Sequence, residues 1–349
     1  LTYYKSIFYE MNLKMGSPRS DTCKYCDLLF NKLSAAQTEE ERKKLQTDSM
    51  LHHFKADQAY RAMHNDSEIA ANNENVTVLC VDLQQVLFCP TLTHSSMYYQ
   101  RQLSTYNFAV HDMGRNKVSF YLWNETIGKR GSTEISSCLL KHITENFQPN
   151  SSQSRKLIVW SDRCVGQNNN WQNLALFRKF VTSGFFDEVH QKFLCSGHSF
   201  LPCDRDFALI EKKKKISTVY IPNEWKYVIG ESFVSRNFEI IELDRNDFKN
   251  FEPVTRGIVK NKELKITEAM WIKFTQDEPS GVYVRKSHNT LVSFQYFTVV
   301  TPRNIITGET FSIFDFVPVY PEDLPITKGK KEGSARYGEV LEGGLPQFN

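Results

Sequence analysis

The sequence has no hydrophobic run of the roughly 20 residues that a membrane-spanning helix requires, so we expect no membrane anchor and no membrane partner. Its first residues mix polar and aromatic side chains, which is not the pattern of a secretory signal. The chain begins at Leu1 rather than at a methionine, and we expect further residues upstream.

Net charge is also small. The 349 residues include 43 basic and 40 acidic side chains, which gives a formal net charge of +3. This balance permits a nucleic-acid partner without requiring one. Basic residues concentrate in Lys212–Lys215 and at residues 328–331, where a Gly- and Lys-rich tail begins. Each run is either a solvated face or a nucleic-acid contact.

The cysteine content does not indicate a disulfide framework. Eight cysteines are spread over a long chain that has no secretory signal. We therefore expect reduced thiols and a reducing compartment.

Three regions differ in pattern. Residues 1–75 are rich in helix-forming residues, and we expect helices at 27–33 and 38–63. Residues 76–216 alternate short apolar runs with amphipathic segments, whereas residues 217–349 are strand-rich and irregular. We predict a helical region, a central α/β domain and a C-terminal region with a tail.

The central region follows a polar linker at residues 67–75. Its predicted elements are three strands and then helix, strand, helix, strand and helix, at residues 77–83, 101–112, 117–124, 131–148, 156–162, 171–182, 189–195 and 203–214. This order is that of an RNase H-like α/β domain, a mixed sheet flanked by helices.

The C-terminal region contains three strand-like segments, at residues 271–274, 282–285 and 292–300. We expect them to be strands of a small antiparallel sheet. Its aromatic residues, including Trp225, Trp271 and those of residues 294–297 (FQYF), are expected to form the core of that sheet, with stacking on nucleic-acid bases as the alternative.

Two aspartates occupy costly positions in the central region. Asp82 interrupts an apolar strand and Asp162 ends another, where a charge requires a partner or a metal ion. In the predicted topology these strands are neighbours, and the helix that carries Asp204 packs over their ends. Three carboxylates offer the hard oxygen ligands that Mg²⁺ or Mn²⁺ prefers, with Asp82 as the shared ligand of a two-metal site for phosphoryl transfer. The alternative for each aspartate alone is a strand-end cap or an ion pair.

Other polar residues lie beside these carboxylates in the sequence. His198 is a candidate for orienting the phosphate or the nucleophile, and otherwise a hydrogen-bonded turn residue. Gln167 and Asn168 are candidates for substrate binding, with capping of the next helix as the alternative. Asp206 and Glu211 are reserve acids.

The N-terminal region contains half of a possible zinc site. Cys23-x-x-Cys26 has the spacing of two tetrahedral zinc ligands, and His52 or His53 is the first choice for a third. The alternative is a pair of buried free thiols. The fourth ligand stays open among His64, Cys80 and Cys195.

Five stretches carry a resemblance to a family of uncharacterised, transposon-derived proteins that is abundant in arthropods. They are residues 21–27 (DTCKYCD), 81–85 (VDLQQ), 105–108 (TYNF), 161–168 (SDRCVGQN) and 197–207 (GHSFLPCDRDF). That family resembles a branch of the RNase H-like (DDE/DDD) transposases.

The resemblance implies cut-and-paste chemistry on DNA in the nucleus, with Mg²⁺ or Mn²⁺ as cofactor and with self-association. Asp82, Asp162 and the His198/Asp204 pair fall on its most characteristic positions, and the resemblance favours His52 as a zinc ligand. A catalytic Glu211 in place of Asp204 is the departure that would alter the triad.

Three functions fit these observations. The first is a DNA transposase that uses Asp82, Asp162 and Asp204. The second is a structure-specific nuclease on the same fold, and the third is a domesticated DNA-binding protein that has lost the reaction. Strand transfer by a 3′-hydroxyl end separates the first from the second. An Asp82→Asn substitution that changes no cellular or biochemical readout while DNA binding persists would favour the third.

Overall fold

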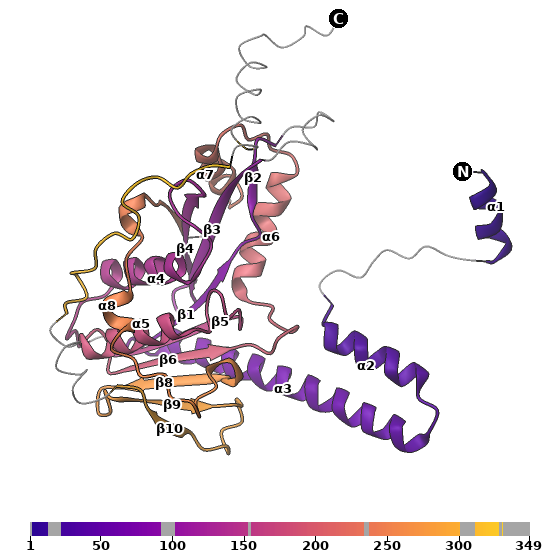
Figure 1. Cartoon of the computed structure of the whole chain (residues 1–349), viewed down its shortest axis with the longest axis horizontal. Helices are drawn as coiled ribbons and strands as arrows, with labels where there is room; N and C mark the ends of the chain where they lie inside the picture. Colours follow the sequence, from indigo (N-terminus) through magenta and orange to yellow (C-terminus); the bar gives the residue numbers. More distant parts are fainter. Residues whose placement is uncertain are drawn as a thin grey trace, which may run out of the picture. The chain divides into compact units, whose positions relative to one another are not determined.

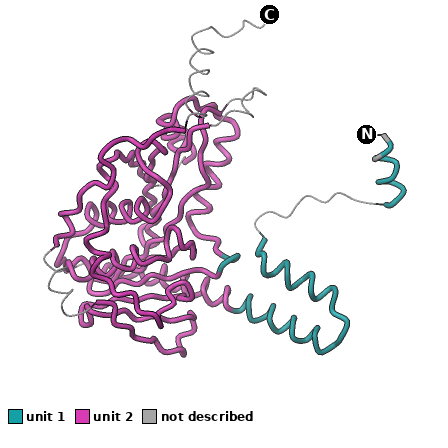
Figure 2. Tube along the Cα trace, in the orientation of Figure 1, with its two compact units in different colours: residues 1–54, 196–198 teal, residues 55–195, 199–349 magenta. Residues whose placement is uncertain are grey.

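The computed structural model describes residues 2–12, 22–91, 102–152, 155–233, 237–300, 311–327 and 330. Apart from residue 330, the tail predicted from residue 328 lies outside these residues. The chain divides into two compact units (Figure 2), a smaller one of residues 1–54 and 196–198 and a larger one of residues 55–195 and 199–349. The units cut the chain differently from the three predicted regions, because the helix α3 contributes to both.

The smaller unit contains helices. α1 spans Thr2–Glu10, α2 spans Lys24–Ala35, and α3 spans Glu39–Asn72 and enters the larger unit after Phe54. α3 begins where the Thr38 hydroxyl accepts a hydrogen bond from the Glu41 N–H at 3.2 Å, which satisfies one open donor of the first turn. α2 and α3 confirm the two helices predicted for this part of the chain.

The predicted linker at residues 67–75 is mostly helical instead, because α3 continues to Asn72. Asp66, which is buried, accepts hydrogen bonds from Trp160 Nε1 at 2.8 Å and from Lys192 Nζ at 2.7 Å. These bonds join the last turns of α3 to the sheet of the larger unit, so tertiary contacts override the polar local sequence.

One mixed sheet forms the centre of the larger unit (Figure 1). Its ten strands run in the order β10-β9-β8-β6-β5-β1-β3-β4-β7, and β2 pairs with β3. β1 is parallel to β5 and antiparallel to β3, and β5 is parallel to β6. The strands are β1 Val76–Leu83, β2 Leu87–Cys89, β3 Leu103–Asp112, β4 Lys117–Asn124, β5 Lys156–Ser161, β6 Glu188–Phe193, β7 Phe238–Glu242, β8 Trp271–Thr275, β9 Gly281–Arg285 and β10 Gln295–Thr298.

Helices cover both faces of the central strands. Their bounds are α4 Ser132–Asn146, α5 Trp171–Thr182, α6 Pro202–Lys214, α7 Trp225–Gly230 and α8 Glu252–Thr255, with short 3₁₀ turns at Pro222–Glu224, Arg245–Asp247 and Ile266–Glu268. Apolar residues of α4 and α5 share a core with one face, which includes Leu79 and Val81 of β1. Residues of α3, α6 and α7 share the second core with Val78 and Cys80. Side chains alternate along β1, so each face has its own core.

The eight elements predicted for the central region all form, which confirms a mixed α/β fold. The three C-terminal strands predicted at residues 271–274, 282–285 and 292–300 also form and pair antiparallel, but they are continuous with the central sheet. β7 pairs in parallel with β4, and β8 pairs antiparallel with β6, so the C-terminal strands extend the central sheet. Strand edges expose unpaired backbone groups, and added strands satisfy them. Trp225 is fully buried in the second core, whereas Trp271 is half-buried on β8.

Within the described ranges, no helix is both long enough and apolar enough to span a lipid bilayer.

Candidate metal sites

Asp82 and Asp162 lie at the same level on neighbouring strands. β1 and β5 run parallel with Cys80 opposite Trp160, and each aspartate follows two residues later. Cys80 and Trp160 both point into the second core. Because side chains alternate along a strand, Asp82 and Asp162 belong to that same face of the sheet.

Asp204 approaches this face from the first turn of α6. The neighbouring Cys203 thiol donates a hydrogen bond to the Cys80 carbonyl at 3.2 Å, which fixes the start of α6 against β1 one pleat before Asp82. Asp204 Oδ2 accepts a hydrogen bond from the Leu201 N–H at 2.6 Å and so caps its own helix. The sheet register and the packing of α6 thus bring the three predicted acids to one end of the sheet.

The electrostatics of Asp82 reflect these neighbours. Its pKa is raised to about 7, first by burial and then by the carboxylates of Asp204 and Asp162. The Leu83 N–H and the Arg130 guanidinium oppose this shift. An acid whose neighbours raise its pKa in this way marks a candidate functional site, because like charges share a buried location.

Hydrogen bonds also anchor the carboxylates of Asp82 and Asp162. The Leu83 N–H donates to Asp82 Oδ1 at 2.8 Å. Asp162 Oδ1 accepts from the Cys164 N–H at 3.1 Å and from Asn168 Nδ2 at 2.6 Å. Such anchors fix the orientation of potential metal ligands.

The three acids are not as closely grouped as a bound ion would require. Among the residues that the structure describes, the group of potential metal ligands whose donor atoms all lie within 4.8 Å of one another consists of cysteines and histidines.

Gln167 and Asn168 belong to the turn between β5 and α5. Asn168 is buried and donates to Asp162, so its side chain orients a carboxylate. The Gln167 and Asn168 carbonyls accept hydrogen bonds from Asn173 Nδ2 at 2.7 and 2.9 Å. The capping residue of α5 is Asn170, whose side chain accepts from the Asn173 N–H.

The reserve acids have other partners. Asp206 is fully buried and lies 2.8 Å from His111 Nδ1 on β3. Glu211 Oε1 accepts from Gln84 Nε2 at 2.9 Å, and Lys214 lies 3.0 Å from its other oxygen. Both acids therefore join α6 to its surroundings.

The cysteine–histidine cluster lies within the smaller unit and consists of Cys23, Cys26, His52 and His198. Cys23 Sγ is 3.3 Å from His52 Nε2, and Cys26 Sγ is 3.3 Å from His198 Nε2. The exposed His53 is also near, with its Nε2 3.4 Å from Cys26 Sγ. A Cys₂His₂ set at these separations could bind a metal ion such as zinc.

The surroundings of His198 differ from those that the sequence predicts. It was expected to orient a phosphate or a nucleophile, yet it completes the cluster, and His64, Cys80 and Cys195 are not in the group. The adjacent Gly197 has φ +81°, and a side chain there would collide with Cys23. Glycine therefore serves both the backbone conformation and the close approach of the two segments. Cys26 and His198 are 172 positions apart in the sequence, so no local pattern could have predicted that they meet.

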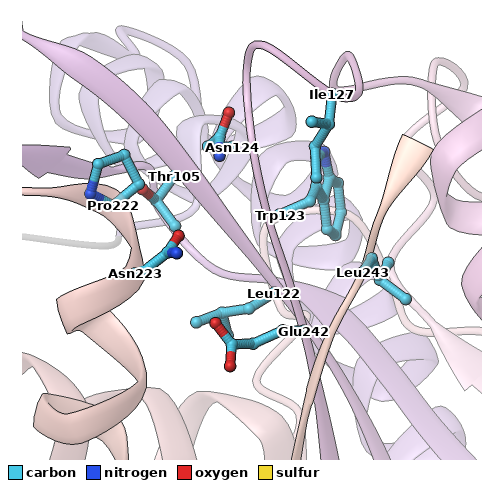
Figure 3. A pocket seen from close by; sticks show the side chains of 9 residues that line it. All are labelled: Thr105, Leu122, Trp123, Asn124, Ile127, Pro222, Asn223, Glu242 and Leu243. Carbon is cyan, nitrogen blue, oxygen red and sulfur yellow. The ribbon is translucent and has the colours of Figure 1, made fainter. Parts of the chain in front are cut away.

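A separate surface pocket lies beside the ends of β4 and β7 (Figure 3). Its lining mixes apolar and polar side chains, namely Thr105, Leu122, Trp123, Asn124, Ile127, Pro222, Asn223, Glu242 and Leu243. None of the predicted site residues lines this pocket.

The model of one protein family matches the chain. The family described as "Domain of unknown function (DUF7869)" matches residues 97–290, more than half of the chain. The match includes Asp162, His198 and Asp204 and begins after Asp82. None of the curated proteins matches the sequence.

Proposed function

The chain belongs to the DUF7869 family, and we propose that it is a metal-dependent polynucleotidyl transferase of the RNase H-like type, a DNA transposase or a nuclease derived from one. The observation that carries this proposal is the convergence of Asp82, Asp162 and Asp204 on one end of the sheet, where the pKa of Asp82 is raised to about 7 by burial and by the other two carboxylates.

The strand order supports an RNase H-like fold. The central strands run β4-β3-β1-β5-β6, with β3 antiparallel to its neighbours and β1, β5 and β6 parallel. Two helices between strands, α4 and α5, cover one face, and α6 covers the other. By resemblance, the acids of such a domain belong on the first strand, at the end of its parallel neighbour and on a helix that packs over their ends. In this chain Asp82 lies on β1, Asp162 directly follows β5, and Asp204 lies in the first turn of α6.

The donor set fits a hard divalent cation. Three carboxylates and no sulfur or imidazole ligand suit Mg²⁺ or Mn²⁺. A bound pair of such ions supplies activation of the attacking oxygen and stabilisation of the leaving oxygen. The chain's own part is to hold the ligands: backbone N–H groups and Asn168 anchor the carboxylates, and the burial of Asp82 strengthens its attraction for a cation.

We also propose that the cysteine–histidine cluster holds one structural zinc ion. Zinc–ligand bonds of about 2.0–2.3 Å in a tetrahedron place neighbouring ligand atoms roughly 3.3–3.8 Å apart. The sulfur–nitrogen separations of 3.3 Å agree with that spacing. A small helical unit gains stability from such an ion because its own apolar core is small.

The test is Mn²⁺ binding by calorimetry on protein of fixed zinc content, together with relaxation of supercoiled plasmid DNA in Mn²⁺. Asp82→Asn and Asp162→Asn should each abolish Mn²⁺ binding and plasmid cleavage. Asp277→Asn is the matched control, because Asp277 is an exposed aspartate outside the cluster. Mn²⁺ binding that survives in both variants, or cleavage that survives in Asp82→Asn, would overturn the proposal.

A further inference from the structure

A single row of side chains crosses the outer half of the sheet. Strand registers pair Trp160 of β5 with Lys192 of β6, Lys192 with Trp271 of β8, and Trp271 with Arg285 of β9. Trp160 also pairs with Cys80 of β1, so the row lies one pleat before Asp82 and Asp162. Residues that pair across strands point to the same face, and this row therefore shares the face of the acids.

The row alternates aromatic rings with cations. Lys192 Nζ lies 3.8 Å from the centre of the Trp271 ring, and the Arg285 guanidinium carbon lies 4.8 Å from the same ring. That guanidinium is also 4.1 Å from the centre of the Phe294 ring, which precedes β10. These separations are those of cation–π pairs.

A second row of side chains lies beside the first, on the strands β8, β9 and β10. Lys273 pairs with Tyr283, and Tyr283 pairs with Tyr296. Lys273 Nζ lies 4.7 Å from the centre of the Tyr283 ring and 5.3 Å from that of Phe294. Tyr296 is 41% exposed, and its ring lies so close to Gly281 that a side chain at that position would collide with it.

The two rows together form one surface, whose inner half lies on β5 and β6 and whose outer half lies on β8, β9 and β10. The two halves differ in charge balance. Lys192, at the inner end, is neutralised by the buried Asp66. Among described residues, Lys273 and Arg285 form no ion pair, and the buried Arg285 Nε has no hydrogen-bond partner. Tyr296 OH donates to Glu278 at 3.4 Å. The outer half therefore places the half-buried Lys273 and the buried Arg285, neither in an ion pair with a described residue, next to the partly exposed rings of Phe294 and Tyr296.

We propose that this outer surface, made of Lys273, Tyr283, Arg285, Phe294 and Tyr296, binds a single strand of DNA on the face of the sheet that carries the acids. Phe294 and Tyr296 stack on bases, and Lys273 contacts the phosphate backbone. The proposal rests on the proposed function, since a polynucleotide is the substrate of that chemistry. Aromatic rings stack on bases of any sequence, and a cation beside them contacts the phosphates. Such a surface binds a single strand without sequence preference.

The test compares two double variants by the fluorescence anisotropy of a labelled oligothymidine 20-mer and of a labelled duplex. Lys273→Gln/Tyr296→Ala removes one cation and one exposed ring from the surface. Lys226→Gln/Tyr227→Ala is the matched control on α7, where Lys226 Nζ lies 5.3 Å from the ring of a tyrosine that is 63% exposed. Full-length, zinc-loaded protein is used throughout, and affinity is measured from low to moderate salt.

We expect the surface variant to bind the single strand about tenfold or more weakly than wild type, because one stacked base alone accounts for roughly that factor. Its log–log salt slope should fall by about 0.7 for the lost phosphate contact. The control should stay within about twofold of wild type.

Three results would overturn the inference. Equal affinities of the surface variant and the control, with wild type binding, would reject the surface and leave the proposed function standing. An equal loss on duplex and single strand would indicate phosphate contact without stacking. No binding of either DNA by wild type, in Mn²⁺ at low salt, would reject both this inference and the proposed function.

Discussion

Replacing Asp82 by asparagine should stabilise the metal-free protein at alkaline pH. The pKa of Asp82 is raised to about 7 by burial and by the carboxylates of Asp204 and Asp162, against about 4 for an exposed aspartate. Keeping this carboxylate ionised in the folded protein at pH 8 therefore costs about 4 kcal/mol, at roughly 1.4 kcal/mol per pH unit. Asparagine has a similar shape, keeps an acceptor for the Leu83 N–H and carries no charge.

The sign of this effect on stability follows from the number of protons that Asp82 binds in the folded and in the unfolded state. Between about pH 4 and pH 7 the folded protein holds one more proton at Asp82 than the unfolded chain does, so this residue lowers stability as pH rises through that window. Above pH 7 its contribution is constant, and below about pH 4 it vanishes. The free energy of unfolding of Asp82→Asn minus that of wild type should therefore grow from near zero at pH 4 to about 4 kcal/mol at pH 8.

Urea unfolding followed by tryptophan fluorescence measures this difference, because all five tryptophans lie in the larger unit. The protein is loaded with zinc and kept free of Mg²⁺ and Mn²⁺. Asp277→Asn removes an exposed carboxylate and should show no such pH-dependent gain. Adding Mn²⁺ at about 100 times its dissociation constant should stabilise wild type by about 2.7 kcal/mol and leave Asp82→Asn unchanged. A variant that is less stable than wild type at pH 8 without Mn²⁺ would refute the charge-repulsion reasoning.

Three further predictions follow from other contacts. His198→Asn should lose the bound zinc, measured by metal analysis of the purified protein, whereas His53→Asn should keep it, and equal zinc contents would contradict the assignment. Asp66→Ala should lower the free energy of unfolding, measured by urea denaturation, by about 3–5 kcal/mol, because it leaves Lys192 buried without its partner. A loss below about 1 kcal/mol would show that the ion pair contributes little to stability. Asn168→Ala should weaken Mn²⁺ binding about 10- to 100-fold in calorimetry through its hydrogen bond to Asp162, and unchanged affinity would limit Asn168 to the turn.

The sequence by itself determined the central elements and singled out the candidate acids. Apolar, β-branched runs predicted β1 and β5, and helical periodicity predicted α4 and α5, because local patterns of burial set these elements. A charge within an apolar strand also stands out locally, so Asp82 could be singled out without coordinates. The Cys23-x-x-Cys26 spacing likewise predicted half of the metal cluster.

Only the tertiary structure decided which distant segments meet. His198 lies against Cys26, which is 172 positions away in the sequence. β8 pairs with β6, which connects the C-terminal strands to the central sheet. The polar end of α3 stays helical because Asp66 finds its partners on the sheet. Each of these outcomes depends on the pairing of a charge, a metal-ligand side chain or a strand edge with a partner far away in the sequence. The free energy of such a pairing depends on both partners, so neither local sequence predicts it.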